Sequence, residues 1–547
     1  MSPKVKSAIK IVKYLFVLLV LLFLLLVAAI NLPFVHRLIT KKANTILAEK
    51  GIPVRIGKAT LLLNGKIGIY QIEILKPGTD TVIYAGRTTV DVYPVPLLSK
   101  KLVIKSIQLS EVVANILTDS VTGEMNIVSV FKTNASEPQK PEKETVKTEN
   151  TNPWEIIVEN IHLKKIRVKY SDPTAGILVQ QKLEKADINF DIFSLLNKQI
   201  DVGNAEIDKP VGLVSVWEAN EKTEDKTGEP STWKFSLQDL EINDLLFTLD
   251  QPDAKQRIEV ALKTGNISLD KLDLASRKIL VRKIELKEPQ IAFSVEESAT
   301  TKPVQKSKPE TFSIPSFSWT VITEKINIKD GNLNYSQSGK NESNTLQNWL
   351  PIQDLNALFS NIQLTPTGYN LELEKISFAL SDKLKIKSGS IYFNTDSLQN
   401  IGLKIELSAL LNGDKKSWFA KDSLLSFKTV LSGSTEILKI EKTELTSSSG
   451  LSFMIDGTIQ QPLQLPNSNC DLHFRSGTIS RSQLSELVKH FSPQTKLPRF
   501  LPFTVSGSIK NSFATPVFTL KMNSNSGNIK ANGKYKLQND FLRIDRL

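Results

Sequence analysis

Alternation of apolar and polar side chains with a period of two runs through most of this chain from Val54 onward, for example in Ile67–Ile74 (IGIYQIEI) and Leu371–Ile376 (LELEKI). Because successive side chains of a strand point to opposite faces of a sheet, this period indicates strands with one apolar and one polar face. The 547 residues are enough for several blocks of such strands. We therefore predict a mostly β protein: a long antiparallel, repeating sheet with a few short helices.

The N-terminal segment has a different character. Tyr14–Ile30 reads YLFVLLVLLFLLLVAAI without a charge, and lysines precede it. This pattern predicts a transmembrane signal anchor over residues 14–32, a cytoplasmic basic tail over 1–13, and translocation of the rest. A cleaved signal peptide is the alternative, because Val27-Ala28-Ala29 resembles a cleavage site. The predicted anchor residues include Tyr14, Leu15, Phe16, Leu22, Phe23 and Ile30.

A short amphipathic helix is predicted over residues 33–51. It begins at Pro33, has apolar residues at helical spacing, and meets Gly51 and Pro53 at its end. Two roles are open for it: capping one end of the sheet, or delivering lipid into a groove.

Three tryptophan-led segments repeat without gaps: Trp154–Tyr170, Trp233–Leu249 and Trp319–Tyr335. Their apolar positions match, and the alternation slips phase at the same place in each copy, which indicates a tight turn or a bulge. The slips lie at Lys164-Lys165, Asn243-Asp244 and Lys329-Asp330. A second match aligns Ser99–Leu109 with Ser276–Leu286, and Leu196–Ile207 repeats the spacing more loosely.

Polar segments rich in Lys, Glu, Thr and Pro separate these repeats and cannot form a core. We therefore predict linkers at 134–153, 219–232 and 296–316 between β blocks at 52–133, 154–218, 233–295 and 317–547. The last block also contains a predicted helix at 481–491, where Leu484, Leu487 and Val488 share a face.

Charge argues against a nucleic-acid partner. Residues 1–50 hold seven of the twelve net positive charges, beside the predicted anchor rather than on the folded part. The basic excess suits a membrane surface instead.

No pattern for catalysis or metal binding is present. The four histidines, His36, His162, His473 and His490, are widely spaced, and Cys470 is the single cysteine, best interpreted as a buried small residue. Phosphate-binding glycine loops, G-x-S-x-G and H-E-x-x-H are missing from the sequence. We predict no catalytic residue, no cofactor, no metal and no enzyme activity.

The apolar faces of the strands need a cover. They either pack together as β-sandwiches or line an open groove that hydrocarbon chains occupy, and the scarcity of helical pattern favours the groove. The candidate lining residues are apolar positions of the three repeats: Leu163, Val168, Ile242, Phe247, Ile328 and Leu333.

Together these residues resemble the N-terminal part of the AsmA-like superfamily and, within it, TamB-type proteins. The resemblance rests on the signal anchor, Val54–Gly57 with the strand after it, Asp91–Leu109, Asp119–Phe131 and the Trp-led strands. It implies a single-pass inner-membrane protein whose bulk is periplasmic, with a taco-like half-barrel groove that carries phospholipid toward the outer membrane. It also implies a β-barrel partner in the outer membrane, although the long C-terminal domain typical of TamB is not in this sequence.

Two functions are therefore weighed. The first is a lipid conduit. The alternative is a scaffold or assembly factor for outer-membrane or secreted proteins, which binds a partner through sheet edges and linkers. The sequence lacks the convergent polar site that an enzyme would require, and the adhesin hypothesis does not explain the cationic anchor.

Overall fold

The computed structural model describes residues 32–546 apart from 62–65, 76–80, 121, 133–154, 195–196, 218–233, 274–275, 297–316, 339–346, 349–350, 382–383, 397–399, 413–422, 465–466, 480–502, 526 and 537–540. Strands make up 78% of these residues and helices 8%, so the predicted mostly β class is confirmed. The predicted anchor at 14–32, apart from Leu32, and the predicted helix at 481–491 lie outside the described residues, as do the greater parts of the three linkers. Within the described ranges, no helix has both the length and the apolar character to cross a membrane.

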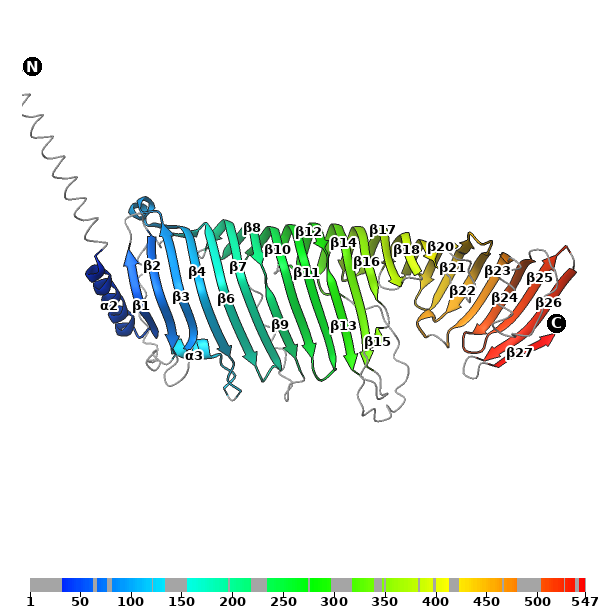
Figure 1. The fold of residues 1–547 in the computed structure, drawn as a ribbon, viewed down its shortest axis with the longest axis horizontal. Helices are drawn as coiled ribbons and strands as arrows, with labels where there is room; N and C mark the ends of the chain where they lie inside the picture. Colours follow the sequence, from blue (N-terminus) through cyan, green and yellow to red (C-terminus); the bar gives the residue numbers. More distant parts are fainter. Residues whose placement is uncertain are drawn as a thin grey trace, which may run out of the picture. The chain divides into compact units, whose positions relative to one another are not determined.

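The chain divides into two compact units, Met1–Glu259 and Val260–Leu547. In the first unit, helix α2 (Pro33–Glu49) precedes a sheet whose strands lie side by side (Figure 1). The elements that follow α2 in this unit are β1 (Val54–Leu61), β2 (Lys66–Leu75), β3 (Thr81–Val92), η1 (Val95–Ser99), β4 (Lys101–Leu117), α3 (Asn126–Lys132), β5 (Glu155–Val158), β6 (Asn160–Asp172), β7 (Ile177–Ser194), β8 (Gln199–Asp208), β9 (Val211–Val216) and β10 (Lys234–Gln251).

The second unit contains strands and one short 3-10 helix among its described residues; most of β11, which begins at Gln256, belongs to it. Its elements are β11 (Gln256–Asp273), β12 (Lys278–Lys287), β13 (Gln290–Glu296), β14 (Thr320–Ser338), β15 (Gln347–Asn348), β16 (Ile352–Thr365), β17 (Gly368–Ser381), β18 (Leu384–Asp396), β19 (Asn400–Leu411), β20 (Ser423–Ser434), β21 (Ile437–Ser447), β22 (Ser452–Gln460), η2 (Pro462–Gln464), β23 (Asn469–Ile479), β24 (Phe503–Ser512), β25 (Val517–Ser524), β26 (Gly527–Lys536) and β27 (Phe541–Arg546). From β16 to β27 each described strand pairs antiparallel with the next along the chain.

The expectation of a purely antiparallel sheet was wrong at three places. β4 pairs parallel with β5 and β6, β10 pairs parallel with β8 and β9, and β14 pairs parallel with β12 and β13. Each parallel pair joins the strands on either side of one predicted linker. Parallel neighbours require the chain to return to the end of the sheet where the previous strand began, and the linkers supply the length for that crossover.

The predicted repeats are confirmed in the backbone. The residues at the phase slips, Lys165, Asp244 and Asp330, all have left-handed φ angles of 54°, 51° and 54°. The strands that pair with them in parallel carry matching left-handed residues at Glu111, Lys209 and Glu288. Eleven residues before each of these lies a further left-handed residue, at Lys100, Lys198 and Arg277. On β6 the result is visible in exposure: Lys164, Lys165 and Arg167 are exposed, while the apolar residues on both sides of the slip are half-buried. The slip therefore keeps the apolar side chains on one face of a bent strand.

Helix α2 confirms the predicted amphipathic helix and caps the free edge of β1 with its side chains. Asn44 Nδ2 donates a hydrogen bond to the Ile56 carbonyl at 2.8 Å, and Asn44 Oδ1 accepts one from the Ile56 N–H at 2.9 Å. One turn earlier, Thr40 Oγ1 accepts a hydrogen bond from the Ala59 N–H at 2.8 Å. Exposed strand edges invite pairing with other chains, and these contacts occupy the groups that such pairing would use.

Replacing Asn44 with Ala should expose this edge. We expect the amide hydrogen of Ile56 to exchange with solvent at least about tenfold faster, since two hydrogen bonds are lost and each contributes about 1 kcal/mol. Hydrogen–deuterium exchange resolved to β1 measures this. Thr45→Ala is the matched control, because Thr45 Oγ1 bonds only to the Lys41 carbonyl within the helix. Equal exchange in the two variants would contradict the capping role.

Candidate functional site: the apolar sheet face

In the first unit, apolar side chains form rows that cross the sheet from strand to strand. Residues directly paired across a ladder point to the same face, so the register defines these rows. One row contains Ala59, Ile69, Thr88, Leu109, Leu163, Ala186, Ile207 and Ile242, from β1 to β10. A second row contains Val54, Ile74, Ile83, Ala114, Val168, Gln181, Gly212 and Phe247.

The structure places the predicted lining residues of this unit in shared rows, with two strands between the members of each pair. Leu163 and Ile242 belong to the first row, and Val168 and Phe247 belong to the second. The Phe247 ring lies over Gly212, where a Cβ atom would come within 3.0 Å of ring carbon Cδ2. Gln181 is a polar residue within the second row. The sequence analysis did not single it out, although the register places it among apolar side chains.

The second unit has longer rows of the same kind. One contains Gly265, Leu286, Ile328, Ala357 and Ile376, and Ile376 reaches the space beside Gly389 on β18. From there it continues through Leu407, Phe427, Leu445, Phe453, Gly477, Val505, Met522 and Ile529. A parallel row runs through Ile267, Ile284, Ile326, Phe359, Leu373, Ile391, Ile405, Thr429, Thr443, Ile455, Phe474, Gly507, Leu520 and Ala531.

Of the predicted lining residues in the second unit, Ile328 lies in the first of these rows. Leu333 pairs instead with Ile291 and Ile352, farther along β14. Most members of the rows were not singled out from the sequence. The alternation places each of them on the apolar face, but only the register shows which of them meet.

Apart from Leu373 and Val505, which are 4% and 5% exposed, the large side chains of these rows whose burial is described remain partly accessible. All six predicted lining residues are half-buried, and the fully buried members of the first-unit rows are the small residues Ala59, Thr88, Ala114, Ala186 and Gly212. Among the described residues, the largest side chain with less than 2% of its surface exposed is a valine, Val130. A β-sandwich would bury Leu, Ile and Phe between two sheets, so this pattern indicates an apolar face without a complete second layer.

The opposite face is polar and carries ion pairs between neighbouring strands. Glu406 lies 3.1 Å from Lys404 and 3.5 Å from Lys428, and hydrogen bonding to Lys404 holds the pKa of Glu406 below its usual value. Arg475 makes two hydrogen bonds to Asp456 and likewise lowers the pKa of that carboxyl. Exposed pairs of this kind add little stability and mark a solvated surface.

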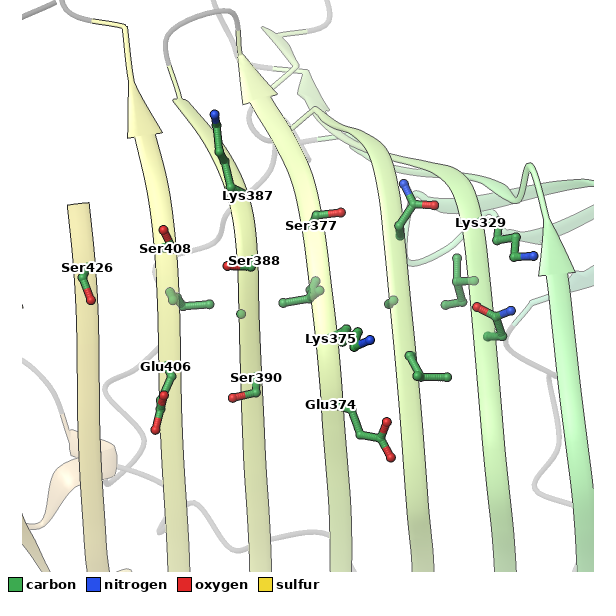
Figure 2. Close-up of a pocket in the computed structure, with 18 of the residues that line it drawn as sticks. Lys329, Glu374, Lys375, Ser377, Lys387, Ser388, Ser390, Glu406, Ser408 and Ser426 are labelled. Atoms are coloured by element: carbon green, nitrogen blue, oxygen red, sulfur yellow. The ribbon is translucent and has the colours of Figure 1, made fainter. Parts of the chain in front are cut away.

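A pocket of about 650 Å³ lies against strands β14 to β20 of the second unit (Figure 2). On β20 its lining includes Ser426 and Lys428 but not Phe427 between them, whereas Ile328, Ile376 and Leu407 of the apolar row also line it. Ser388, Ser408 and Ser426 are direct cross-strand neighbours there. The residues that line this pocket include no histidine or cysteine; its carboxylates are Glu374 and Glu406, and Glu406 is ion-paired with Lys404 and Lys428. The pocket therefore combines hydroxyl, charged and apolar side chains.

Of the histidines and the cysteine for which the sequence predicts no catalytic or metal role, Cys470 and His473 lie on β23 and His162 lies on β6. His162 Nδ1 is 2.6 Å from Asp187 Oδ1 on the neighbouring strand, His473 lies near Asp471, and His490 falls outside the described residues. Cys470 is buried as predicted, and its burial raises the pKa of the thiol. Among the described side chains, no group of three or more His, Cys, Asp or Glu is arranged to hold a metal ion.

Fold and site together define a class: a β protein built on long sheets, each with one polar face and one apolar face that stays partly open. No protein-family model, curated protein or solved structure matches this chain.

Proposed function

We propose that this protein is an AsmA/TamB-like lipid carrier, held in the inner membrane by its N-terminal segment, whose periplasmic sheet forms a groove that carries phospholipid acyl chains toward the outer membrane. The observation that supports this proposal most is the rows of mainly half-buried apolar side chains that cross the strands of each unit. Each acyl methylene that leaves water for such a surface gains about 0.8 kcal/mol. A ligand of this kind also completes the missing apolar layer.

The length of the rows suits transfer rather than storage of one lipid. From Gly389 to Ile529 the second-unit row crosses nine strands. At about 4.8 Å between strands it measures about 40 Å, more than the roughly 30 Å hydrocarbon thickness of a whole bilayer. An acyl chain can therefore shift along the row while its neighbours remain apolar.

The scaffold alternative binds a partner through sheet edges or linkers, and strand addition in particular needs a free sheet edge. The β1 edge does not offer one, because Thr40 and Asn44 of α2 occupy its backbone groups. We therefore place the lipid conduit ahead of an assembly factor that binds a partner by strand addition.

Site-specific photocrosslinking of the full chain in membranes tests the proposal. A photoreactive phenylalanine analogue at Phe427 points from the apolar row, whereas the same analogue at Lys428 points from the polar face. We expect phospholipid to become attached to the protein at position 427 and not at 428, as measured by mass spectrometry of the labelled peptide. Absence of lipid at both positions would reject the groove as a lipid path.

A further inference from the structure

Two segments of the first unit hold the most exposed large apolar side chains of the described chain. Leu98 is 89% exposed and Val95 73% exposed in η1, and Phe34 is 66% exposed in the first turn of α2. Soluble surfaces tolerate single exposed apolar residues, but a group of large ones marks a contact surface.

The topology brings these two segments to the same end of the strands. α2 runs antiparallel to β1, since Asn44 bonds to Ile56 and Thr40, one turn earlier, bonds to Ala59. The beginning of α2 therefore lies toward the Leu61 end of β1. Leu61 pairs with Ile67, and Ile67 pairs with Val90 near the end of β3, where η1 follows (Figure 1).

η1 is a stiff projection rather than a loose loop. Pro94 and Pro96 restrict its backbone, and Lys100 ends it with a left-handed φ of 56° and an N–H bond to the Leu97 carbonyl. The Tyr93 N–H bonds to the Val103 carbonyl across the base of the turn. Val95 and Leu98 are thus held outward at fixed positions, which lowers the entropic cost of inserting them elsewhere.

Positive charge accompanies both apolar tips. Lys100 follows η1 directly, whereas the next residue, Lys101, is ion-paired with Glu155 at 2.9 Å. Helix α2 carries Arg37, Lys41 and Lys42, with Glu49 as its only acidic residue. Lysine and arginine beside exposed apolar residues match the anionic head groups and apolar interior of a phospholipid surface.

We infer that η1 and the first turn of α2 form a membrane seat: Val95, Leu98 and Phe34 insert into the phospholipid surface, and the lysines and arginine around them bind anionic head groups. The bilayer is the occupant because the uncharged run Tyr14–Ile30 immediately precedes α2 in the sequence. A chain that enters at Leu32 and Pro33 brings this end of the strands to the same surface. The seat would place the start of the apolar rows against lipid. Its role in delivering lipid to these rows rests on the proposed function, whereas the exposed side chains and their shared end of the strands do not.

A fluorescent probe at Leu98 tests the seat in the full chain. The single Cys470 is replaced with Ala, Leu98→Cys carries an environment-sensitive fluorophore, and the protein is reconstituted in vesicles of phosphatidylcholine and phosphatidylglycerol with nitroxide-labelled lipid. The matched control is Leu117→Cys, an exposed leucine at the far end of β4, the strand that follows η1. We expect quenching of the Leu98 probe to be at least about threefold stronger, since apolar residues of interfacial segments lie 5–10 Å inside the lipid boundary.

Equal and weak quenching at both positions would overturn the seat. Lipid crosslinking at Phe427, measured on the same preparations, separates this failure from failure of the proposed function. A Leu98 probe that stays in water while position 427 still crosslinks lipid rejects the seat and leaves the conduit standing. A quenched Leu98 probe without lipid at 427 supports the seat and rejects the conduit.

Discussion

Replacing Phe427 with Asp should remove most phospholipid from the neighbouring part of the apolar row. Phe427 pairs with Leu407 on one side and Leu445 on the other, so its ring closes a continuous apolar path. A carboxylate at this position must be desolvated whenever an acyl chain covers it, which costs several kcal/mol without a partner. We expect photocrosslinking of phospholipid from position 453, two strands away, to fall about tenfold or more, because 1.4 kcal/mol already corresponds to a factor of ten.

Protonation of the new carboxyl must be avoided in this experiment. Desolvation favours the neutral form and raises the pKa of a buried Asp, so crosslinking should be measured at about pH 8 and should recover in part as the pH falls. Recovery at lower pH separates the effect of charge from loss of the aromatic ring.

Val430→Asp is the matched control for Phe427→Asp. Val430 lies on the same strand but on the polar face, paired with Lys404 and Lys442. The same change of an apolar residue to Asp there meets two lysines and solvent, and we expect no loss of lipid at position 453. If both variants lost lipid equally, the effect would come from a damaged sheet rather than from a blocked groove.

Much of the fold could be predicted from the sequence because strand alternation is a local property. The phase slips at Lys165, Asp244 and Asp330 were visible as two polar residues in succession, and all three have left-handed backbones. The parallel pairing of β4 with β6 was not predictable in this way. Alternation has the same period in parallel and antiparallel sheets, so it does not show which end of the sheet a strand starts from.

The sequence predicts which side chains lie on the apolar face, but not which of them are neighbours across the strands. Leu163 and Ile242 were selected as apolar repeat positions, yet their shared row depends on Leu109, Ala186 and Ile207, whose register comes from long-range pairing. The cap on β1 was equally hidden. Asn44 and Thr40 look like ordinary polar residues of a helix until the helix is placed beside an edge strand.

Gly457→Ala should destabilise the second unit more than any surface change. Gly457 has a φ of 145°, and a Cβ atom there would lie 2.1 Å from the Asp471 carbonyl oxygen and 2.8 Å from the Leu472 Cα. Both obstacles are backbone atoms of the paired strand β23, so relief requires separation of β22 from β23. We expect a loss of at least about 3 kcal/mol, which combines backbone strain of 1–3 kcal/mol with broken ladder hydrogen bonds.

Gly527→Ala isolates the clash from the strain. Gly527 has a φ of 148°, yet among the described residues other than its chain neighbours no atom lies within 4 Å of the position of its Cβ. The two variants therefore have similar backbone strain, and only Gly457→Ala adds steric overlap. Hydrogen exchange of the β22 and β23 amides should increase strongly in Gly457→Ala and stay near the wild-type rate in Gly527→Ala. Gly457 lies between Ile440 and Leu472 in an apolar row, so Gly457→Ala should also reduce lipid crosslinking at position 453. Unchanged hydrogen exchange in Gly457→Ala would show that β22 and β23 are not held in this close register.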